Sequence, residues 1–433
     1  MNYKFYTFVA ILASTLTGIL PAMGQKSGPV NDTIYMGASY INEVYYNMAA
    51  GNKGAVNRKQ WDIAFRANRM SASILTNDAA TNDPNSLGVE LYTYPKSDTS
   101  GWATMDTVGY FKWKKMVNSK SDWEEGAFCR NQKGHPDYGW GKYNASTHNV
   151  MGDSLFIIKL RDGSLRKLWI KEKFSSDNVF NFRYAKIDGS GDTTIMLDCN
   201  PYSTKNFVGY SISTKQIVDF EPAASSQWDI MFTKYMYTYP DGTLYPVTGM
   251  LSNYGVKVNT FHPVPLTYKI WDKATMDSTR SAIGWEWKKY NSGTNKYEII
   301  DSTVYFVQDK GGNIHKLVFK EFVGGTSSRV VFQKEMISAL GIDEMAKSDF
   351  NVAVYPNPVK DLMNLVINPG NSASTTISLM DISGRKVFSN KYELPKETLS
   401  TLQVPVSGIP AGMYIVVIQN GTNTVSRKVL VNN

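Results

Sequence analysis

The stretch Trp-Asp-Ile-Ala-Phe at residues 61–65 decides the fold, because it returns as Trp-Asp-Ile-Met-Phe at residues 228–232, an offset of 228 − 61 = 167. A second pair keeps the same spacing: Gly-Val-Glu-Leu at residues 88–91 returns as Gly-Val-Lys-Val at residues 255–258. Two matches in register indicate an internal duplication. In both copies large apolar residues alternate with other residues, which predicts half-buried β-strands.

The duplication continues into a predicted β-hairpin. Residues 155–160 and 165–171 read as its two strands, and Asp162-Gly163 supplies a tight turn in which glycine takes a positive φ. A third strand is expected beside the hairpin at residues 179–184, with its counterpart at residues 329–334. Each copy is therefore predicted to be a β-domain.

The first copy is longer than the second. Residues 111–115 match residues 285–289 at an offset of 285 − 111 = 174, whereas residues 156–158 match residues 305–307 at an offset of 305 − 156 = 149. The difference, 174 − 149 = 25, gives the first copy 25 extra residues between positions 115 and 153. This excess is the main place where the two copies are expected to differ.

Composition agrees with an all-β chain. Aromatic residues make up 13% of the sequence, with 26 Tyr and 10 Trp, and helical apolar stripes are few. We predict two tandem β-domains followed by a small immunoglobulin-like β-sandwich. The predicted segments are a signal peptide at 1–24, a first repeat at 25–190, a second repeat at 191–340, a linker at 341–349 and a C-terminal domain at 350–433.

The order of strand motifs in each copy resembles the HmuY family of secreted haem-binding proteins, over most of residues 30–336. The resemblance implies a β-domain that holds haem in an apolar slot through one or two axial ligands, usually His or Met. The chain departs from the family because it has two copies, lacks a lipid-anchor cysteine in its signal region and adds a C-terminal domain.

Four histidines limit the candidate haem ligands. His135 and His148 both lie in the 25-residue excess, and we expect them to be the axial ligands of a haem iron. The alternative is an ordinary surface loop stiffened by aromatic side chains. His315 stands where the first copy has Arg166 and is expected to be an exposed polar position, and His262, before Pro263, is expected to be an ordinary polar residue. Nearby aromatic and thioether residues in the same segment are Trp123, Tyr138, Trp140, Tyr143 and Met151.

The C-terminal segment carries a second set of motifs. Its short alternating runs, separated by Asn, Pro and Gly turns, predict a small antiparallel sandwich. It resembles a type A sorting domain of the type IX secretion system, which implies transport across the outer membrane by that machinery. The residues that carry the resemblance are Tyr355, Pro356, Asn357, Pro358, Gly384, Gly412 and Tyr414.

The N-terminus predicts the same route. Lys4 precedes the mostly apolar residues 5–20, and small residues lead to a cleavage site expected after Gly24. No later window is long and apolar enough for a spanning helix. We therefore expect a secreted or cell-surface protein of a Gram-negative bacterium.

Charge and cysteine content limit the partners. The formal net charge of +8 is spread along the chain, so nucleic acid is not an expected partner, whereas anionic ligands or surface lipopolysaccharide are open alternatives to plain solubility. Haem or haemoproteins are the partners that the family resemblance implies. Cys129 and Cys199 allow one disulfide, which the sequence leaves open.

Three functional classes follow. Haem binding is the favoured one. An adhesin or glycan-binding protein is the alternative, with tryptophans as stacking platforms, and a hydrolase built on two carboxylates is the third. Because no motif of a known catalytic class is present, we predict that the chain is not an enzyme. Asp62 and Asp229 are expected to be solvent-side structural residues. The platform tryptophans would be Trp102, Trp113, Trp123, Trp140, Trp285 and Trp287.

Overall fold

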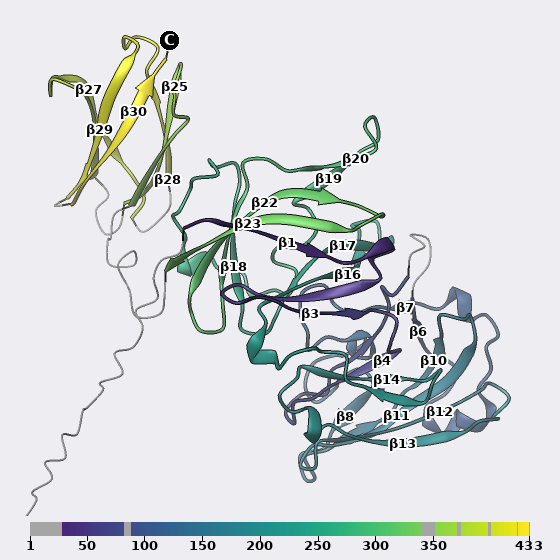
Figure 1. The fold of residues 1–433 in the computed structure, drawn as a ribbon. Coiled ribbons are helices and arrows are strands. Elements are labelled where there is room, and N and C mark those ends of the chain that lie inside the picture. Colours follow the sequence, from purple (N-terminus) through teal and green to yellow (C-terminus); the bar gives the residue numbers. More distant parts are fainter. Residues whose placement is uncertain are drawn as a thin grey trace, which may run out of the picture.

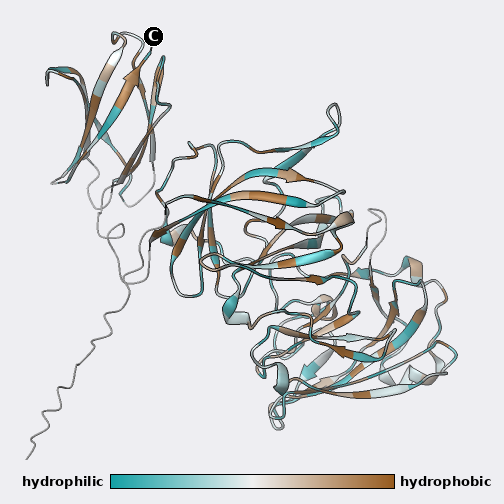
Figure 2. Cartoon of the chain, viewed as in Figure 1, coloured by the Kyte–Doolittle hydropathy of each residue, from teal (hydrophilic) through white to brown (hydrophobic). Residues whose placement is uncertain are grey.

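The computed structural model describes residues 28–81, 88–338, 351–369, 374–396, 400–421 and 423–432. The all-β prediction is confirmed, since these residues form thirty strands and seven short 3-10 helices (Figure 1). Hydrophobic and hydrophilic residues alternate along many strands, as half-buried sheets require (Figure 2). The predicted signal peptide and the linker at 341–349 lie outside the described residues. Among the described helices, none has the length and apolar character of a membrane span.

The first domain consists of two sheets with a core between them. One sheet has the order β13-β12-β11-β10-β6-β7 with β8 and β9 attached, and the other has the order β15-β14-β4-β5. The predicted hairpin is confirmed as β10 and β11, with β12 beside it. The elements are β4 (Ile63–Arg66), β5 (Ile74–Thr76), β6 (Glu90–Thr93), η2 (Thr99–Thr104), η3 (Tyr110–Lys112), β7 (Lys115–Met116), η4 (Ala127–Cys129), β8 (Gly141–Tyr143), β9 (Val150–Gly152), β10 (Leu155–Lys159), β11 (Leu165–Phe174), β12 (Val179–Ala185), β13 (Thr193–Asp198), η5 (Asn200–Tyr202), β14 (Phe207–Ser211) and β15 (Gln216–Val218).

The second domain repeats this plan. Its sheets have the orders β1-β23-β22-β21-β18 and β17-β16-β2-β3, with a separate ribbon of β19 and β20. The elements are β1 (Val30–Tyr35), η1 (Ala38–Tyr40), β2 (Asn42–Asn47), β3 (Gly51–Asn57), η6 (Ser225–Gln227), β16 (Ile230–Thr238), β17 (Leu244–Ser252), β18 (Lys257–Phe261), η7 (Lys273–Thr275), β19 (Lys288–Asn291), β20 (Lys296–Ile299), β21 (Val304–Gln308), β22 (Ile314–Val323) and β23 (Arg329–Ser338).

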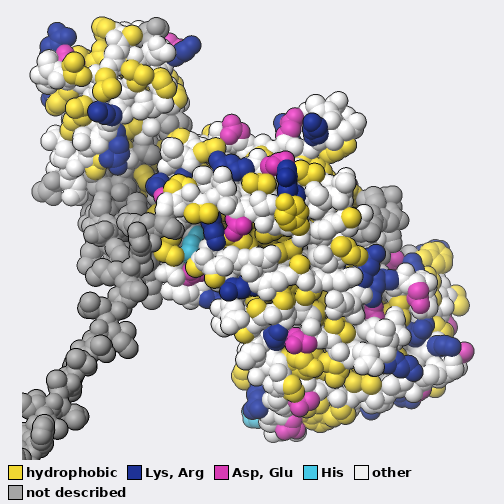
Figure 3. Space-filling view, viewed as in Figure 1, with side chains coloured by type: hydrophobic (Ala, Val, Ile, Leu, Met, Phe, Trp, Pro, Cys, Tyr) yellow, Lys and Arg dark blue, Asp and Glu magenta, His cyan; other side chains and the backbone are white. Residues whose placement is uncertain are grey.

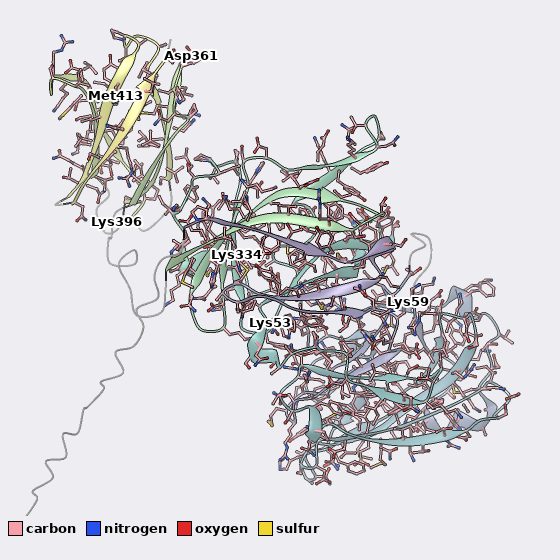
Figure 4. All side chains as sticks on the ribbon, viewed as in Figure 1. Lys53, Lys59, Lys334, Asp361, Lys396 and Met413 are labelled. Carbon is pink, nitrogen blue, oxygen red and sulfur yellow. The ribbon has the colours of Figure 1, made fainter. Side chains whose placement is uncertain are left out.

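The two repeats exchange their first strands. The hairpin β2-β3 pairs with β16 of the second copy, and the hairpin β14-β15 pairs with β4 of the first copy. Likewise β1 pairs with β23, and β13 pairs with β12. In Figure 1 the purple N-terminal strands accordingly lie among the green strands of the second domain, and in Figure 4 Lys53 of β3 and Lys334 of β23 both lie there.

This exchange moves the domain borders from those expected. The cores do not divide near residue 190, because the core of the first domain includes Val208 and Tyr210, whereas Ile34 and Val44 belong to the core of the second. One domain is built from the chain between β4 and β15. The other domain includes the N-terminal strands: β1 joins the sheet of β18, β21, β22 and β23, and β2 and β3 join the sheet of β16 and β17.

The repeated aspartates hold the exchanged hairpins. Asp62 is fully buried, and its Oδ2 accepts the N–H of Ile212, which follows β14, at 2.8 Å. Asp229 is 2% exposed, and its Oδ2 accepts the N–H of Met48, which follows β2, at 2.7 Å. The prediction of a structural role fits these contacts, but the prediction of a solvent-side carboxylate is wrong. Each carboxylate instead ties its strand to the hairpin contributed by the other repeat.

We predict that deleting residues 28–57 unfolds the second domain. The deletion removes five side chains that are at most 1% exposed in its core, namely Ile34, Met36, Val44, Tyr46 and Met48. At about 2 kcal/mol for each buried apolar side chain, the loss is roughly 10 kcal/mol, comparable to the whole stability of a domain. Limited proteolysis should then degrade the second domain before the first.

A cut chain provides the matched control for this deletion. Lys59 and Gln60 are exposed between β3 and β4, so a protease site inserted there can be cleaved after folding. The N-terminal fragment should remain bound to the cleaved protein until denaturant is added. Release of that fragment in native buffer would contradict this pairing of the N-terminal strands with the second domain.

The third domain is a sandwich of two sheets, β24-β25-β28 and β27-β26-β29-β30, around its own core. Val366 also belongs to a cluster with Val264, Tyr268 and other apolar residues of the second domain. The strands are β24 (Asn351–Tyr355), β25 (Leu362–Asn368), β26 (Ser374–Asp381), β27 (Lys386–Glu393), β28 (Ser400–Pro405), β29 (Gly412–Asn420) and β30 (Asn423–Val431).

Both cysteines are free and buried in the core of the first domain. Burial raises the pKa of the Cys129 and Cys199 thiols to about 12, so both are protonated at neutral pH. The disulfide that the sequence left open is not formed in this structure.

An aromatic cluster joins the first two domains. It contains Trp61 and Phe207 from one domain, and Trp228 and Tyr235 from the other. Two buried carboxyl groups lie at its border: burial raises the pKa of Asp78 to about 7, and it raises the pKa of Glu221 to about 7.

These carboxyl groups predict a pH dependence of stability. A pKa raised on folding means that the native state binds more protons than the unfolded state between about pH 4 and pH 7. The stabilisation is complete below pH 4 and is lost as the pH rises through 7. The free energy of unfolding of the wild type, measured in urea, should therefore fall by roughly 5 kcal/mol between pH 5 and pH 8, about half from each group. The free energy of unfolding of the Asp78→Asn variant should fall less over the same pH range. An equal dependence on pH in the two proteins would show that Asp78 is not one of the groups responsible.

Candidate functional site

The extra segment of the first repeat forms a hairpin that is held against the main sheet. Strands β8 and β9 pair with Tyr143 opposite Val150, and β9 also pairs with β11. A Cβ added at Gly152 would lie 1.7 Å from the carbonyl oxygen of Ile170, so only glycine allows this approach. The segment is thus a built part of the domain.

A pocket of about 690 Å³ lies between this hairpin and two other segments of the first domain. One wall is the loop from β4 to β5, a second is the extra segment, and a third is the turn that follows β11. We call it the histidine pocket. It is lined by Arg69, Met70, Ser71, Ala72, His135, Tyr138, Tyr143, His148, Val150, Lys173, Ser175 and Ser176.

The structure brings His135 and His148 to this one pocket, with the ring of Tyr143 next to both. Ring centroids are 5.4 Å apart for His135 and Tyr143, and 6.1 Å apart for Tyr143 and His148. The Tyr143 hydroxyl lies 2.6 Å from Nδ1 of His148. That hydrogen bond fixes the ring of His148 and leaves Nε2 as the nitrogen that can meet a ligand.

His148 also has an unusual backbone. Its φ is +59°, in the left-handed region that few residues other than glycine adopt. The loop around it is closed by its own N–H, which donates to the carbonyl oxygen of Asn144 at 2.8 Å. A left-handed non-glycine residue that is held by its loop is a feature found at binding sites.

A buried lysine supports the loop opposite the histidines. Lys173 is 1% exposed, and its Nζ donates to the carbonyl oxygens of Asn68, at 2.8 Å, and of Ser71. Burial lowers the pKa of Lys173 to about 8. These bonds position Arg69 and Met70 at the pocket mouth, where the Met70 side chain is 90% exposed.

Burial also acts on a phenol in the wall. It raises the pKa of Tyr138, with a smaller contribution from Tyr143, so the Tyr138 hydroxyl stays neutral. The wall therefore carries aromatic and small apolar surface rather than negative charge. Arg69 is the cationic side chain at its mouth.

The donor set fits haem better than a bare metal ion. No group of three or more His, Cys, Asp or Glu side chains gathers in the described part of the chain, so a closed structural metal site finds no ligands there. Haem brings its own ring nitrogens and needs only one or two axial ligands, for which imidazole nitrogen and phenol oxygen are both suitable. An arginine at the mouth can pair with a propionate.

Four of the six tryptophans expected to form a glycan-binding platform are buried, whereas Trp113 and Trp285 are half-buried. Trp102, Trp123, Trp140 and Trp287 are between 0% and 8% exposed, because large aromatic side chains in these sheets fill the cores. The expectation of an exposed His315 is also wrong, since this side chain is 2% exposed and its Nε2 lies 2.9 Å from Oδ2 of Asp309.

The loop from β4 to β5 and Lys173 also line the pocket, and the sequence did not predict either of them. Nothing in the local pattern of Asn68-Arg69-Met70 signals a site, since the loop reaches the histidines only through the fold. The one available signal was the 25-residue excess itself.

The hairpin of this segment has a counterpart in β19 and β20 of the second repeat, where Tyr290 and Asn295 stand in place of Tyr143 and His148. The Tyr290 hydroxyl donates to Oδ1 of Asn295 at 3.1 Å, and Asn295 has a φ of +53°. Because Asn replaces His there, no equivalent histidine pocket is expected in the second repeat.

The sorting-motif residues have clear structural roles in the third domain. Asn357, between Pro356 and Pro358, clamps the last strand: its Oδ1 accepts the N–H of Leu430 at 2.8 Å, and its Nδ2 donates to the carbonyl oxygen of Lys428 at 3.0 Å. This side-chain clamp follows β24, which ends at Tyr355.

Two turns complete the motif. Gly384 has a φ of +84° in the turn between β26 and β27. Gly412 opens β29, and the Tyr414 hydroxyl donates to the carbonyl oxygen of Pro410 at 2.8 Å, which is a tyrosine corner. These residues set the turns of the sandwich.

Charge gives no single interaction patch on the face shown in Figure 3, where Lys and Arg side chains are dispersed among Asp and Glu. This distribution neither marks nor locates a surface for lipopolysaccharide.

One curated relative is an enzyme. The endo-acting ulvan lyase of Formosa agariphila is 23% identical over 142 residues, which cover 33% of this chain and 25% of that protein. The chain thus matches a quarter of that enzyme's length. The prediction of a non-enzyme, drawn from missing motifs, is contradicted by this match, because active sites assembled only by the fold leave no local motif.

Two solved structures were also matched. They are dimeric latent PorU and PorZ, both of Porphyromonas gingivalis. PorU gives a TM-score of 0.22 and 11% identity, and the match covers 81% of this chain and 34% of that chain. PorZ gives a TM-score of 0.15, 11% identity and coverage of 67% and 44%. These scores are too low to relate the folds. The HmuY resemblance finds no support in any of these matches.

The family model for the secretion system C-terminal sorting domain matches residues 353–432. These residues are the sandwich whose clamp, turn and tyrosine corner are described above. The chain therefore carries a type IX secretion C-terminal sorting domain, which directs it to the cell surface or the medium.

Proposed function

We propose that this exported protein binds haem and that the histidine pocket of the first domain is its site. The observation that carries the proposal is the convergence of His135 and His148 on one pocket with Tyr143 next to both. Two imidazoles, a phenol and an arginine at the mouth form the set of side chains that a haem iron and its propionates require.

Each residue has a defined part in this proposal. His148 offers Nε2, because its Nδ1 is engaged with Tyr143. His135 provides the second imidazole, with its ring centroid 5.4 Å from that of Tyr143. Tyr138 and Val150 supply flat apolar contact, and Arg69 pairs with a propionate. The haem can come free or from haemoproteins outside the cell.

The test is a hemin titration of the purified full-length protein, followed in the Soret band. We expect a shifted band that saturates, with a spectrum typical of nitrogen ligation to the iron. Spectra identical to those of free hemin at every ratio would overturn the proposal.

A second candidate function is action on a polymer such as ulvan, and the lyase relative favours it. The hydrogen-bonded pair of Tyr143 and His148 can exchange a proton with a substrate, and Arg69 can meet an anionic group. Incubation with ulvan, followed by the ultraviolet absorbance of newly formed C=C bonds, separates the two candidates. Product that depends on the Tyr143 hydroxyl, in a protein that leaves hemin spectra unchanged, would favour the lyase.

A further inference from the structure

A second cavity, of about 60 Å³, lies between the first two domains and has no part in the histidine pocket. Both domains contribute to its lining: Thr76 ends β5 of the first, and Trp228 and Arg280 belong to the second. Arg58 lies in the segment that connects β3 to β4 and so joins the two domains. Lys59, the next residue, is labelled at this junction in Figure 4.

Hydrogen-bond donors without partners gather at this cavity. Among the described residues, five buried atoms of its lining have no hydrogen-bond partner: Nη2 of Arg58, Oγ1 of Thr76, Nε1 of Trp228, and Nε and Nη1 of Arg280. The four side chains are only 3%, 0%, 1% and 5% exposed. Buried donors are almost always satisfied, because leaving them unpaired is costly.

These donors are held in place by their neighbours. The Arg280 guanidinium lies 3.8 Å from the ring centre of Trp123. Arg58 donates through Nε to the carbonyl oxygen of Tyr40 and through Nη1 to that of Ala79, both at 2.6 Å, which leaves Nη2 over. Neither arginine can turn away without breaking these contacts.

The carboxylates of the lining are already engaged. Glu43 accepts from the hydroxyl of Tyr45 at 2.9 Å, and Asp78 accepts the N–H of Asn118 at 2.8 Å. Glu221 accepts the N–H groups of Asn206 and Phe207. Burial raises the pKa of Glu43, and it raises the pKa of Asp78 and of Glu221 to about 7, which weakens the negative charge of the lining.

We infer that this cavity is a binding site for a small oxyanion, the size of sulfate or acetate, held between the two domains. Four of the five unpaired atoms can only donate, and two arginines supply positive charge in the planar form that suits oxyanions. At roughly 10–15 Å³ for each water, the cavity has room for about four to six waters or one such anion. An anion bound here bridges the two domains and resists their separation.

The experiment uses selenate, which resembles sulfate and scatters X-rays anomalously. The midpoint temperature of thermal unfolding of the full-length protein should rise with selenate concentration and then level off. Chloride at matched ionic strength should not raise it in this way. Crystals grown with selenate should give an anomalous peak within hydrogen-bond distance of Arg280 and Thr76. No peak in the cavity, or equal effects of selenate and chloride, would overturn the inference.

Variants assign the effect to the cavity. Arg280→Lys keeps the positive charge but removes two of the unpaired donors, and it should weaken selenate binding at least tenfold. Thr76→Val removes one hydroxyl with little change of shape, so it remains informative if the arginine variant does not fold, and it should weaken binding severalfold. Arg329→Lys, on the surface of β23, is the matched control and should bind like the wild type. Unchanged affinity in Thr76→Val would contradict the site.

Discussion

Removing residues 350–433 is expected to abolish delivery of the protein to the cell surface and the medium while leaving its folding intact. These residues form a sandwich with its own core, and residues 353–432 match the sorting-domain family. Among the described residues, no strand of the first two domains pairs with a strand of this sandwich. Immunoblots of cell, surface and medium fractions should therefore find the shortened protein only inside the cell.

A single substitution offers a sharper version of this deletion. Asn357→Ala removes both hydrogen bonds that hold β30 beside the motif, at 2.8 Å and 3.0 Å, and each such bond contributes about 1 kcal/mol. The amount of protein at the cell surface and in the medium should fall, because β30 is held less firmly beside residues 355–358. Asn364→Ala, on the exposed side of β25, is the control. Normal amounts of the truncated protein outside the cell would show that another signal directs export.

The double variant His135→Ala, His148→Ala is expected to lose at least about 100-fold in hemin affinity, because even partners behind a metal ligand commonly contribute 10- to 100-fold. Neither imidazole is buried, so the substitution should leave the free energy of unfolding nearly unchanged. Titrations in the Soret band measure the loss. Tyr143→Phe should cost about tenfold, since it removes only the hydrogen bond to Nδ1 of His148.

The control for the double variant is His262→Ala. This exposed imidazole lies outside the pocket, and its Nδ1 is 2.9 Å from the hydroxyl of Thr303. It should leave the hemin titration unchanged. Wild-type affinity in the double variant would mean that the iron, if bound, takes other ligands.

Local patterns predicted the strands well but not their partners. The alternation at residues 61–65 and the turn at Asp162-Gly163 are properties of neighbouring residues. The turn appears as predicted, with a φ of +81° at Gly163, and the strand forms as β4, but β4 is buried on both faces rather than half-buried. The exchange of hairpins is not such a property. A strand from one copy fits the sheet of either copy, because duplication makes the sheets alike, so pairing is settled by chain connection and packing. The burial of Asp62 and Asp229 follows from that exchange.

The candidate site was predictable only in part, because one of its walls is local in the sequence and the other is assembled by the fold. A segment with two histidines that the second repeat does not share is visible in the sequence, and the fold does bring His135 and His148 to one pocket. The opposite wall comes from residues 69–72 and Lys173, which only the fold places there. Most of the tryptophans expected at the surface are buried, because a large aromatic side chain in a two-sheet domain fills the core.

The number of haem molecules bound by each chain tests the central claim most directly. The histidine pocket depends on His135 and His148, and the matching hairpin of the second repeat has Asn295 in place of His148. A hemin titration of the full-length protein at concentrations well above the dissociation constant should therefore end at one haem for each chain. An end point of two would mean that both repeats bind through features they share, and an end point of zero would mean that the pocket serves another ligand.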